Sequence, residues 1–315
     1  MSSQVAVASL GGTITMTGAG AVSPTLGAKD LVQGLEVGEI ATLATIPGAS
    51  LTFTTLLDAF DWADKQVSQG ARGVVIIQGT DTLEETAYLF DCLWPHEEPV
   101  VVTGAMRHPG LPGADGPANL AAAVAVAAAP NSRGRGALLV LNDEIHAARW
   151  VRKTHSSLLN AFESFPGPLG LQIEGAPQYF HPAHQLPALP RPQDVPTVPL
   201  IESTLDDDGA LLDWLNVGGV VVAATGAGHV SAGMAEAISR ARFPVVVATR
   251  TGAGTTFRNT YGFTGSESDL IQRGVVMAGW LCPRKARVLL RLALGARQPI
   301  EDVFANRGSI SSDGR

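Results

Sequence analysis

The sequence predicts an α/β protein in which strands and helices alternate along the chain. Short runs of β-branched residues, such as 74–77, are typical of strands that are buried on both faces of a sheet. Other segments, such as 54–69, place their apolar residues on one side of a helix. Strands that alternate with helices indicate a parallel, doubly wound sheet, and 315 residues suffice for about two such domains.

The expected elements follow one another in this alternating order along the whole chain. Strands are expected over 5–10, 40–46, 74–77, 99–103 and 137–141, and helices over 28–35, over 54–69, after Thr82 and after Pro117. Further along, strands are expected over 220–224 and 245–248, and helices over 231–241 and 283–294.

A proline-rich segment separates the two groups of expected elements. Residues 181–199 contain six prolines, which is typical of a stiff linker at a domain boundary. We therefore expect two open, mostly parallel sheets. One is a larger, flavodoxin-like N-terminal domain over residues 1–180, and the other a smaller C-terminal domain over 200–315.

Composition and charge exclude several classes of protein. The chain has 22 Lys and Arg against 29 Asp and Glu, a net charge of −7, and no basic run that would bind nucleic acid. Cys92 and Cys282 form no Cys-x-x-Cys pair, so we expect two buried thiols rather than disulfides or a zinc site. The sequence contains neither a signal peptide nor an apolar run long enough to cross a membrane, which predicts a cytoplasmic protein.

The most informative stretch follows the expected strand 74–77. Gly79 has no Cβ, so backbone or ligand can come close where the strand ends. Thr80 and Asp81 then fall in the crevice where open α/β sheets bind their ligands. They would present a hydroxyl and a carboxylate beside the free N–H groups of a helix N-terminus, where a substrate carboxylate could dock.

The same stretch also fits a purely structural role. Thr82 with Glu85, or Asp81 with Glu84, has the spacing of a capping box, which predicts the start of a helix. On that interpretation Asp81 only caps the helix.

A second threonine follows the first expected strand. Residues 5–10 end at Gly11-Gly12, so Thr13 lies at a strand end as Thr80 does. Residues 15–27 are rich in Gly, Ala, Ser and Thr, which favours a mobile loop that could act as a lid or could be a plain surface loop.

Familiar cofactor motifs are missing from the sequence. No Gly-Ala-Gly turn continues to a dinucleotide fingerprint, no Gly-Lys pair allows a phosphate-binding loop, and no Gly-x-Ser-x-Gly elbow occurs. Asp143, Glu144, His146 and His155 match no standard set of metal ligands, so we expect no metal.

Lysine is scarce in this chain and therefore informative. Four lysines occur against eighteen arginines, and only a neutral lysine can take a proton from a hydroxyl. Lys153 follows an expected strand by about one loop, so it could reach the crevice. A relay of Thr80, Lys153 and Asp81 is then chemically sensible, with the carboxylate holding the ammonium.

Several stretches together resemble the signature motifs of bacterial-type L-asparaginases, and the likeness runs from Ala8 to about Leu294. The matching stretches are Gly11-Gly12-Thr13-Ile14, Gly79-Thr80-Asp81-Thr82-Leu83-Glu84-Glu85-Thr86, Val102-Thr103-Gly104-Ala105-Met106-Arg107, Ala114-Asp115-Gly116-Pro117, Leu141-Asn142-Asp143, Lys153-Thr154 and Pro283-Arg284-Lys285-Ala286-Arg287.

This resemblance implies hydrolysis of the side-chain amide of asparagine to aspartate and ammonia, without a cofactor. Thr13 matches the family's nucleophile. Thr80, Asp81 and Lys153 match its second triad, of which Thr80 and Asp81 also contact the substrate. The family's two-domain fold agrees with the alternation described above, and its members work as homodimers or homotetramers.

Other substrate contacts are implied by the same resemblance. Ser50 or Ala49 falls where the family holds the substrate carboxylate, and Ser50 is preferred because it offers a hydroxyl. Ala105 matches a further substrate contact. His229 stands where a neighbouring subunit usually contributes an asparagine, and Leu51 replaces a family glutamine.

The chain also departs from the family on the expected lid. Residues 14–87 contain no tyrosine, whereas family members commonly carry one near the nucleophile. Three alternatives follow from these features: a glutaminase-asparaginase of broader specificity, an amidase subunit of an amidotransferase, and a catalytically silent protein that binds asparagine or aspartate. The amidase subunit usually has an additional N-terminal domain, which makes it the weaker alternative.

Overall fold

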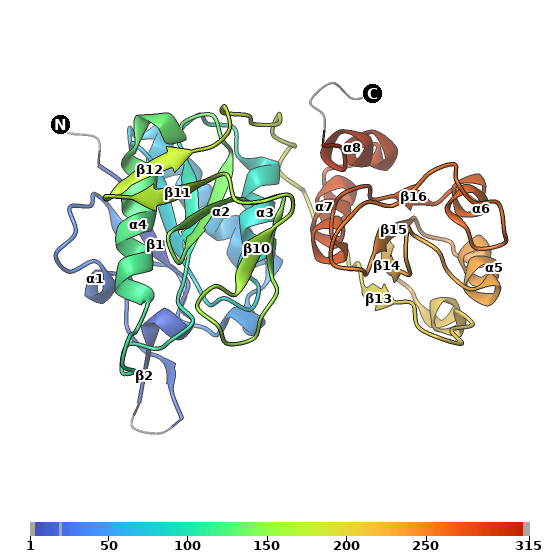
Figure 1. Cartoon of the computed structure of the whole chain (residues 1–315), viewed down its shortest axis with the longest axis horizontal. Coiled ribbons are helices and arrows are strands. Elements are labelled where there is room, and N and C mark those ends of the chain that lie inside the picture. Colours follow the sequence, from blue (N-terminus) through green and yellow to red (C-terminus); the bar gives the residue numbers. More distant parts are fainter. Residues whose placement is uncertain (1–3, 19–20, 311–315) are drawn as a thin grey trace. The chain divides into compact units, whose positions relative to one another are not determined.

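The computed structural model describes residues 4–18 and 21–310, which form two compact units that divide between residues 188 and 189 (Figure 1). Residues 182–199, which cover nearly all of the expected linker, form no helix or strand in either unit. Their role as a linker stays a prediction.

Five parallel strands form the centre of the N-terminal sheet. In chain order they are β1 (Ala6–Ser9), β4 (Ile40–Thr42), β5 (Val74–Ile77), β6 (Val100–Thr103) and β7 (Ala137–Leu141). In space their order is β4-β1-β5-β6-β7, so the second strand lies outside the first and the third lies on its other side. This is the flavodoxin-like order, which confirms the predicted fold class.

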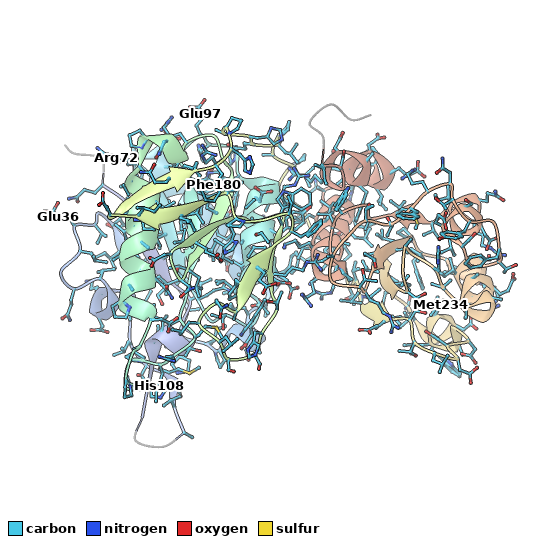
Figure 2. All side chains as sticks on the ribbon, in the orientation of Figure 1. Glu36, Arg72, Glu97, His108, Phe180 and Met234 are labelled. Atoms are coloured by element: carbon cyan, nitrogen blue, oxygen red, sulfur yellow. The ribbon has the colours of Figure 1, made fainter. Side chains whose placement is uncertain are left out.

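Helices cover both faces of this sheet (Figure 1). The alanine-rich helix α4 (Gly116–Ala128) packs with α1 (Ala28–Leu31) on an apolar cluster that includes Val7, Val75 and Leu138. The helix α2 (Phe53–Ser68) follows β4 after a 3₁₀ turn, and α3 (Leu83–Leu93) follows β5 after a short connection. Charged side chains such as Glu36, Arg72 and Glu97 lie on the surface (Figure 2).

Strands that the sequence analysis did not predict extend the sheet beyond β7. They are β8 (Glu144–Ala147), β11 (Gly170–Ile173) and β12 (Ala176–Tyr179), all antiparallel to their neighbours. A separate two-stranded ribbon consists of β9 (Val151–Lys153) and β10 (Phe162–Ser164). These strands are three or four residues long and partly exposed, so they lack the continuous apolar run that marks the central strands.

Several element boundaries also differ from expectation. The first helix and β4 are shorter than predicted, whereas α2 agrees within one residue at each end. The expected loop 15–27 contains a hairpin of β2 (Met16–Thr17) and β3 (Ser23–Pro24) after the 3₁₀ turn η1 (Thr13–Thr15). The carbonyl of Thr15 accepts hydrogen bonds from the backbone N–H groups of Thr25 and Leu26, which holds the base of this hairpin. Residues 19 and 20 of this expected loop lie outside the described residues.

The C-terminal unit repeats the α/β pattern on a smaller scale. Its parallel strands lie in chain order and are β13 (Leu200–Glu202), β14 (Val220–Ala224), β15 (Val245–Thr249) and β16 (Val276–Met277). Its helices are η4 (Ala210–Trp214), α5 (Ala232–Arg240), α6 (Glu267–Gln272), α7 (Pro283–Gly295) and α8 (Ile300–Arg307). Met234 of α5 belongs to its apolar core (Figure 2).

The state of the two cysteines and the lengths of the helices can be compared with the expectations from the sequence. Cys92 and Cys282 are both buried thiols that are not joined in a disulfide, as expected. Within residues 4–18 and 21–310, every helix is too short or too polar to cross a membrane.

Three glycines bring the ends of β1 and β5 together with the 3₁₀ turn η2 (Gly48–Ser50). Gly12 has a φ of 90°, and a Cβ on it would lie 2.1 Å from Cα of Gly79. A Cβ on Gly79 would lie 2.9 Å from the backbone nitrogen of Gly48. The chain reverses its direction of growth across the sheet between β1 and β5, which is where such sheets bind ligands.

This contact predicts that Gly79→Ala opens the junction between the two strand ends. The added methyl would meet backbone atoms rather than a flexible side chain, so we expect a loss of about 1–3 kcal/mol in the free energy of unfolding. Gly167→Ala is the matched control, because a Cβ there would have no atom within 4 Å. Denaturant unfolding of both variants checks this, and equal stabilities would contradict the steric account.

Candidate active site

A lysine, a threonine and an aspartate meet at the carboxyl end of β5. Lys153 Nζ donates a hydrogen bond to Thr80 Oγ1 at 2.8 Å, and Asp81 Oδ1 lies 3.6 Å from the same nitrogen. Thr80 is 5% exposed, whereas the Asp81 side chain is mostly open to solvent. The structure thus brings together three residues that the sequence analysis proposed as a relay.

The start of α3 is held differently from the predicted capping box. Thr82 is the residue before the helix, but its hydroxyl donates to the carbonyl of Gly48 at 2.9 Å and does not cap the helix. Glu84 is buried, and its carboxylate accepts a hydrogen bond from the backbone N–H of Lys153. The prediction that a helix begins here is therefore confirmed, while the predicted caps are wrong because tertiary partners compete for both side chains.

Thr13 lies in η1, directly after Gly12. The hydroxyl and the backbone N–H of Thr15 both donate to the carbonyl of Gly12, at 2.7 and 2.9 Å, which stabilises this tight turn. Thr13 itself is partly exposed. Because Gly12 packs on Gly79, the turn that carries Thr13 adjoins the strand end that precedes Thr80.

The other sequence-predicted contacts lie on neighbouring strand ends. Ser50 is exposed at the end of η2, and the hydrogen bond from Thr82 to Gly48 ties that turn to the start of α3. Ala105 follows β6 but is completely buried in the apolar core, so it presents no exposed atom. Its assignment to substrate binding stays a prediction.

The sequence analysis missed a polar network that holds the loop after β6. The Asp115 carboxylate accepts the backbone N–H groups of Met106 and Arg107 at 2.9 and 2.8 Å. Asn119 donates to the carbonyl of Gly104 and to Asp115, both at 3.0 Å. The motif around Asp115 carried the signal for this network, but the sequence alone does not show which backbone groups it binds.

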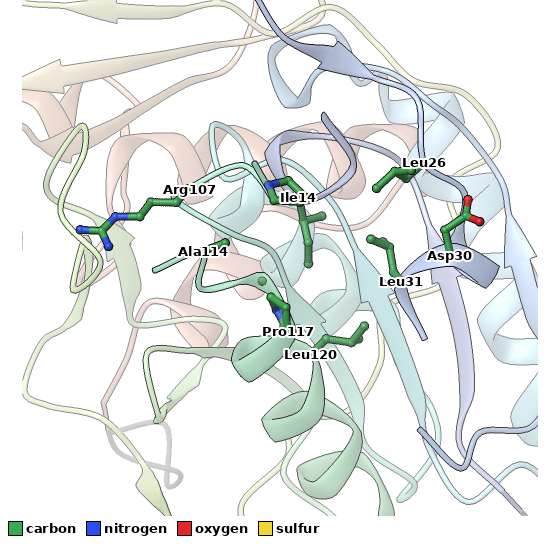
Figure 3. A pocket seen from close by; sticks show the side chains of 10 residues that line it. Ile14, Leu26, Asp30, Leu31, Arg107, Ala114, Pro117 and Leu120 are labelled. Carbon is green, nitrogen blue, oxygen red and sulfur yellow. The ribbon is translucent and has the colours of Figure 1, made fainter. Parts of the chain in front are cut away.

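An apolar cavity lies beside the turn that carries Thr13 (Figure 3). Its volume is about 180 Å³, and its wall includes Ile14, Leu26, Leu31 and Leu120 together with Asp30 and Arg107. Ile14 is the direct neighbour of Thr13 in the sequence. The space therefore adjoins the hairpin base and the start of α4.

The residues considered as metal ligands have other partners. His146 is buried, with its Nδ1 2.9 Å from Ser164 Oγ and its Nε2 3.3 Å from a Glu144 oxygen. His155 accepts backbone N–H groups through Nδ1. Within the described part of the chain, no three His, Cys, Asp or Glu side chains gather as metal ligands would.

In the C-terminal unit, His229 is held by a buried glutamate that the sequence analysis missed. His229 Nε2 lies 3.0 Å from Glu267 Oε2. The other Glu267 oxygen accepts the backbone N–H groups of Thr260 and Tyr261, each at 2.7 Å. The imidazole ring also meets Tyr261 and Phe263 edge-on, at centroid distances of 4.9 and 5.2 Å.

The environment of Glu267 favours its charged form. Burial by itself would raise the pKa of this completely buried carboxyl. Hydrogen bonds from Tyr261, from its own backbone amide, from Thr260 and from His229 outweigh burial, so the pKa is lowered below its ordinary value of 4.5.

Comparison with known proteins places these features in one family. Residues 4–185 match the family model for the N-terminal domain of asparaginase, and residues 197–305 match that of the glutaminase/asparaginase C-terminal domain. The chain belongs to the asparaginase family. Membership makes it an amidohydrolase, and it confirms the resemblance that the strand-end motifs indicated.

Individual asparaginases match most of the chain. A probable L-asparaginase of Deinococcus radiodurans is 36% identical over 250 residues, which cover 76% of each chain. An L-asparaginase of Bacillus licheniformis is 32% identical over 332 residues, covering 96% of this chain and 99% of that one. The crystal structure of a probable cytoplasmic L-asparaginase from Campylobacter jejuni matches with a TM-score of 0.86 at 30% identity, covering 96% of this chain and 99% of that one.

The lowered pKa of Glu267 predicts an acid-sensitive contribution to stability. A carboxyl whose pKa is depressed on folding stabilises the protein above its unfolded pKa, and this stabilisation is lost as the pH falls through the folded value. We expect Glu267→Gln to lower the free energy of unfolding at neutral pH by about 1–3 kcal/mol. The difference from wild type should shrink below the ordinary pKa of 4.5.

Denaturant unfolding of wild type and variant near pH 7 and about pH 3.5 measures this effect. Glu202→Gln is the control, because Glu202 meets Arg250 at 3.3 Å in an exposed pair of the same unit. Such pairs contribute at most about 1 kcal/mol. A stability difference for Glu267→Gln that is the same at both pH values would contradict the prediction.

Proposed function

We propose that this chain hydrolyses the side-chain amide of L-asparagine to L-aspartate and ammonia through a threonine nucleophile and without a cofactor. The observation that carries the proposal is the contact of Lys153 with Thr80 and Asp81. It lies at the strand end that the glycine junction ties to Thr13. Family membership supports the same reaction.

In this mechanism Thr13 attacks the amide carbon of the substrate. Its oxygen forms an ester with the acyl group, and ammonia leaves after taking a proton. Water then hydrolyses the ester, releasing aspartate and restoring the hydroxyl. Backbone N–H groups at the strand ends stabilise the tetrahedral oxyanion, at roughly 3–4 kcal/mol per donor.

Lys153 and Asp81 serve Thr80 in the same mechanism. As water attacks the ester, it gives a proton to the Thr80 oxygen, which passes its own hydroxyl proton to a neutral Lys153. The Asp81 carboxylate holds the resulting ammonium until the proton returns to the oxygen of Thr13. The short Nζ–Oγ1 distance gives the proton a direct path. The alternative within this site is acylation of Thr80 itself, with the same lysine as base.

Ser50, with Thr80 and Asp81, would hold the substrate's α-carboxylate and α-amino groups.

A broader glutaminase-asparaginase activity is the second candidate. The glutaminase-asparaginase of Pseudomonas fluorescens biotype A is 31% identical over 323 residues, covering 95% of this chain and 88% of that one. Initial rates with L-asparagine and L-glutamine separate the two activities.

The proposed setting is a cytoplasmic homodimer or homotetramer that acts on a small molecule rather than on nucleic acid or a membrane. The Campylobacter protein is described as cytoplasmic, which supports this location. A relative in Haemophilus influenzae is described as periplasmic, so fractionation of the native cells is the deciding measurement.

A catalytically silent asparagine-binding protein is the rival from another class, because the expected lid carries no tyrosine. We expect the purified chain to release ammonia from L-asparagine. Lys153→Met, Thr13→Ala and Thr80→Ala should each lower turnover by roughly two or more orders of magnitude, and their combinations should not be additive. Coupled measurement of ammonia checks this. Binding of asparagine with no ammonia would favour the silent protein, and a Lys153→Met variant with normal turnover would exclude the relay.

His229 is proposed to close the active site of a neighbouring subunit, with Glu267 holding its ring. We expect His229→Ala to raise KM more than it lowers kcat. The Thr13→Ala and His229→Asp proteins, each inactive by itself, are dissociated, mixed and reassembled. In a mixed pair of subunits, one site receives Thr13 from the His229→Asp subunit and His229 from the Thr13→Ala subunit, so that site is intact and activity should return. Absence of recovery, with hybrid formation confirmed by mass spectrometry, would place His229 outside the neighbour's site.

A further inference from the structure

The strand that carries Lys153 is not part of the sheet that carries Thr80. β9 pairs with β10 in a two-stranded ribbon, whereas β5 lies in the eight-stranded sheet. No ladder of β-sheet hydrogen bonds between β9 and β5 therefore sets the position of Lys153 relative to Thr80. Some other interaction must therefore hold Lys153 where its side chain can contact Thr80 at 2.8 Å.

A buried carboxylate supplies a tie of this kind. Glu84 lies in the first turn of α3, four residues after Thr80, and is 2% exposed. It accepts the backbone N–H of Lys153 at 2.5 Å. The N–H of Thr154, directly after β9, donates to the carbonyl of Ala161, directly before β10, at 2.8 Å. One edge of β9 is thus bound to β10 and the other to α3.

The ribbon has a second attachment, to the antiparallel part of the large sheet. Ser164 of β10 lies 2.9 Å from Nδ1 of His146 in β8. This contact is on the strand opposite to Lys153, so it anchors the ribbon without setting the reach of the lysine side chain. The Glu84 contact acts directly at the backbone of Lys153.

We propose that Glu84 is a positioning residue for the base, which it holds within proton-transfer distance of Thr80; this inference rests on the proposed function. The carboxyl oxygen of Glu84 gives this N–H a partner in a largely buried setting, where an N–H without a partner is costly. Glu84 and Thr80 lie on either side of the start of α3, so the distance between them is set by the backbone there. The hydrogen bond from Lys153 to Glu84 therefore fixes the Lys153 backbone relative to Thr80. A shift of about 1 Å in such a group can lower turnover by as much as 100-fold.

The test compares two substitutions at Glu84 with one at its neighbour. Glu84→Ala removes the acceptor, and we expect kcat to fall roughly 10- to 100-fold while KM changes less than about threefold. Glu84→Gln keeps a carbonyl oxygen of the same reach and should retain kcat within about fivefold. Glu85→Ala, in the same helical turn, is the matched control and should resemble wild type in kcat.

Unfolding and a parallel Lys153 variant make the outcomes distinct. If Glu84→Ala lowers the melting temperature but leaves kcat of the folded protein at the Glu85→Ala level, Glu84 is structural and the inference is wrong. If Glu84→Gln loses as much kcat as Glu84→Ala, the hydrogen-bond acceptor is not what matters, and the inference is also wrong. A Lys153→Met variant with normal turnover would instead contradict the proposed function, because Lys153 would then not be the base. Any loss of kcat in Glu84→Ala would in that case have a cause other than the position of Lys153. A crystal structure of Glu84→Ala should show the Lys153 backbone displaced from α3.

Discussion

The backbone contact between Gly12, Gly79 and Gly48 is the constraint on which the candidate site depends. It brings two adjacent strand ends and a 3₁₀ turn closer together than any side chain at these positions would allow. Thr13, Thr80 and Ser50 each follow one of these glycines by one or two residues. Three polar side chains from separated parts of the sequence therefore come to one edge of the sheet.

This arrangement uses the topology of the sheet. β1 and β5 are the strands between which the chain changes its direction of growth, so the connections after them lead to opposite faces and leave a crevice. The parallel strands are buried and offer little specific chemistry of their own. Function is carried by the residues that follow them, supported by partly exposed polar groups such as Asp115, which fixes the loop after β6.

Buried carboxylates recur as organisers of the functional residues. Glu84 holds the backbone of Lys153, and Glu267 holds the ring of His229 and two backbone N–H groups. Each carboxylate binds one group that is distant in the sequence, the Lys153 N–H for Glu84 and the His229 ring for Glu267, and Glu267 also accepts the nearby N–H groups of Thr260 and Tyr261. Burial of a charge is tolerated when it is paired in this way, and the geometry of its partners becomes rigid.

The sequence by itself determined the fold class, the parallel strands of the N-terminal sheet and the family. Continuous β-branched runs, glycine turns and threonines at strand ends are local patterns, so they can be recognised in the sequence without knowing which residues are in contact. The antiparallel strands after β7 were missed because they are short, contain both polar and apolar residues, and are partly exposed. Which parts of the chain they pair with is a non-local property.

Only the tertiary structure decided the partners of the polar side chains. Thr82 and Glu84 each belong to one of the two capping boxes that local spacing allows. In the structure the Thr82 hydroxyl binds the carbonyl of Gly48, and the Glu84 side chain binds the backbone N–H of Lys153. Local spacing shows what a side chain can reach within its own turn, whereas folding brings stronger or better-placed partners from 34 and 69 residues away. For that reason the identity of the candidate site residues was visible in the sequence, and their positioning was not.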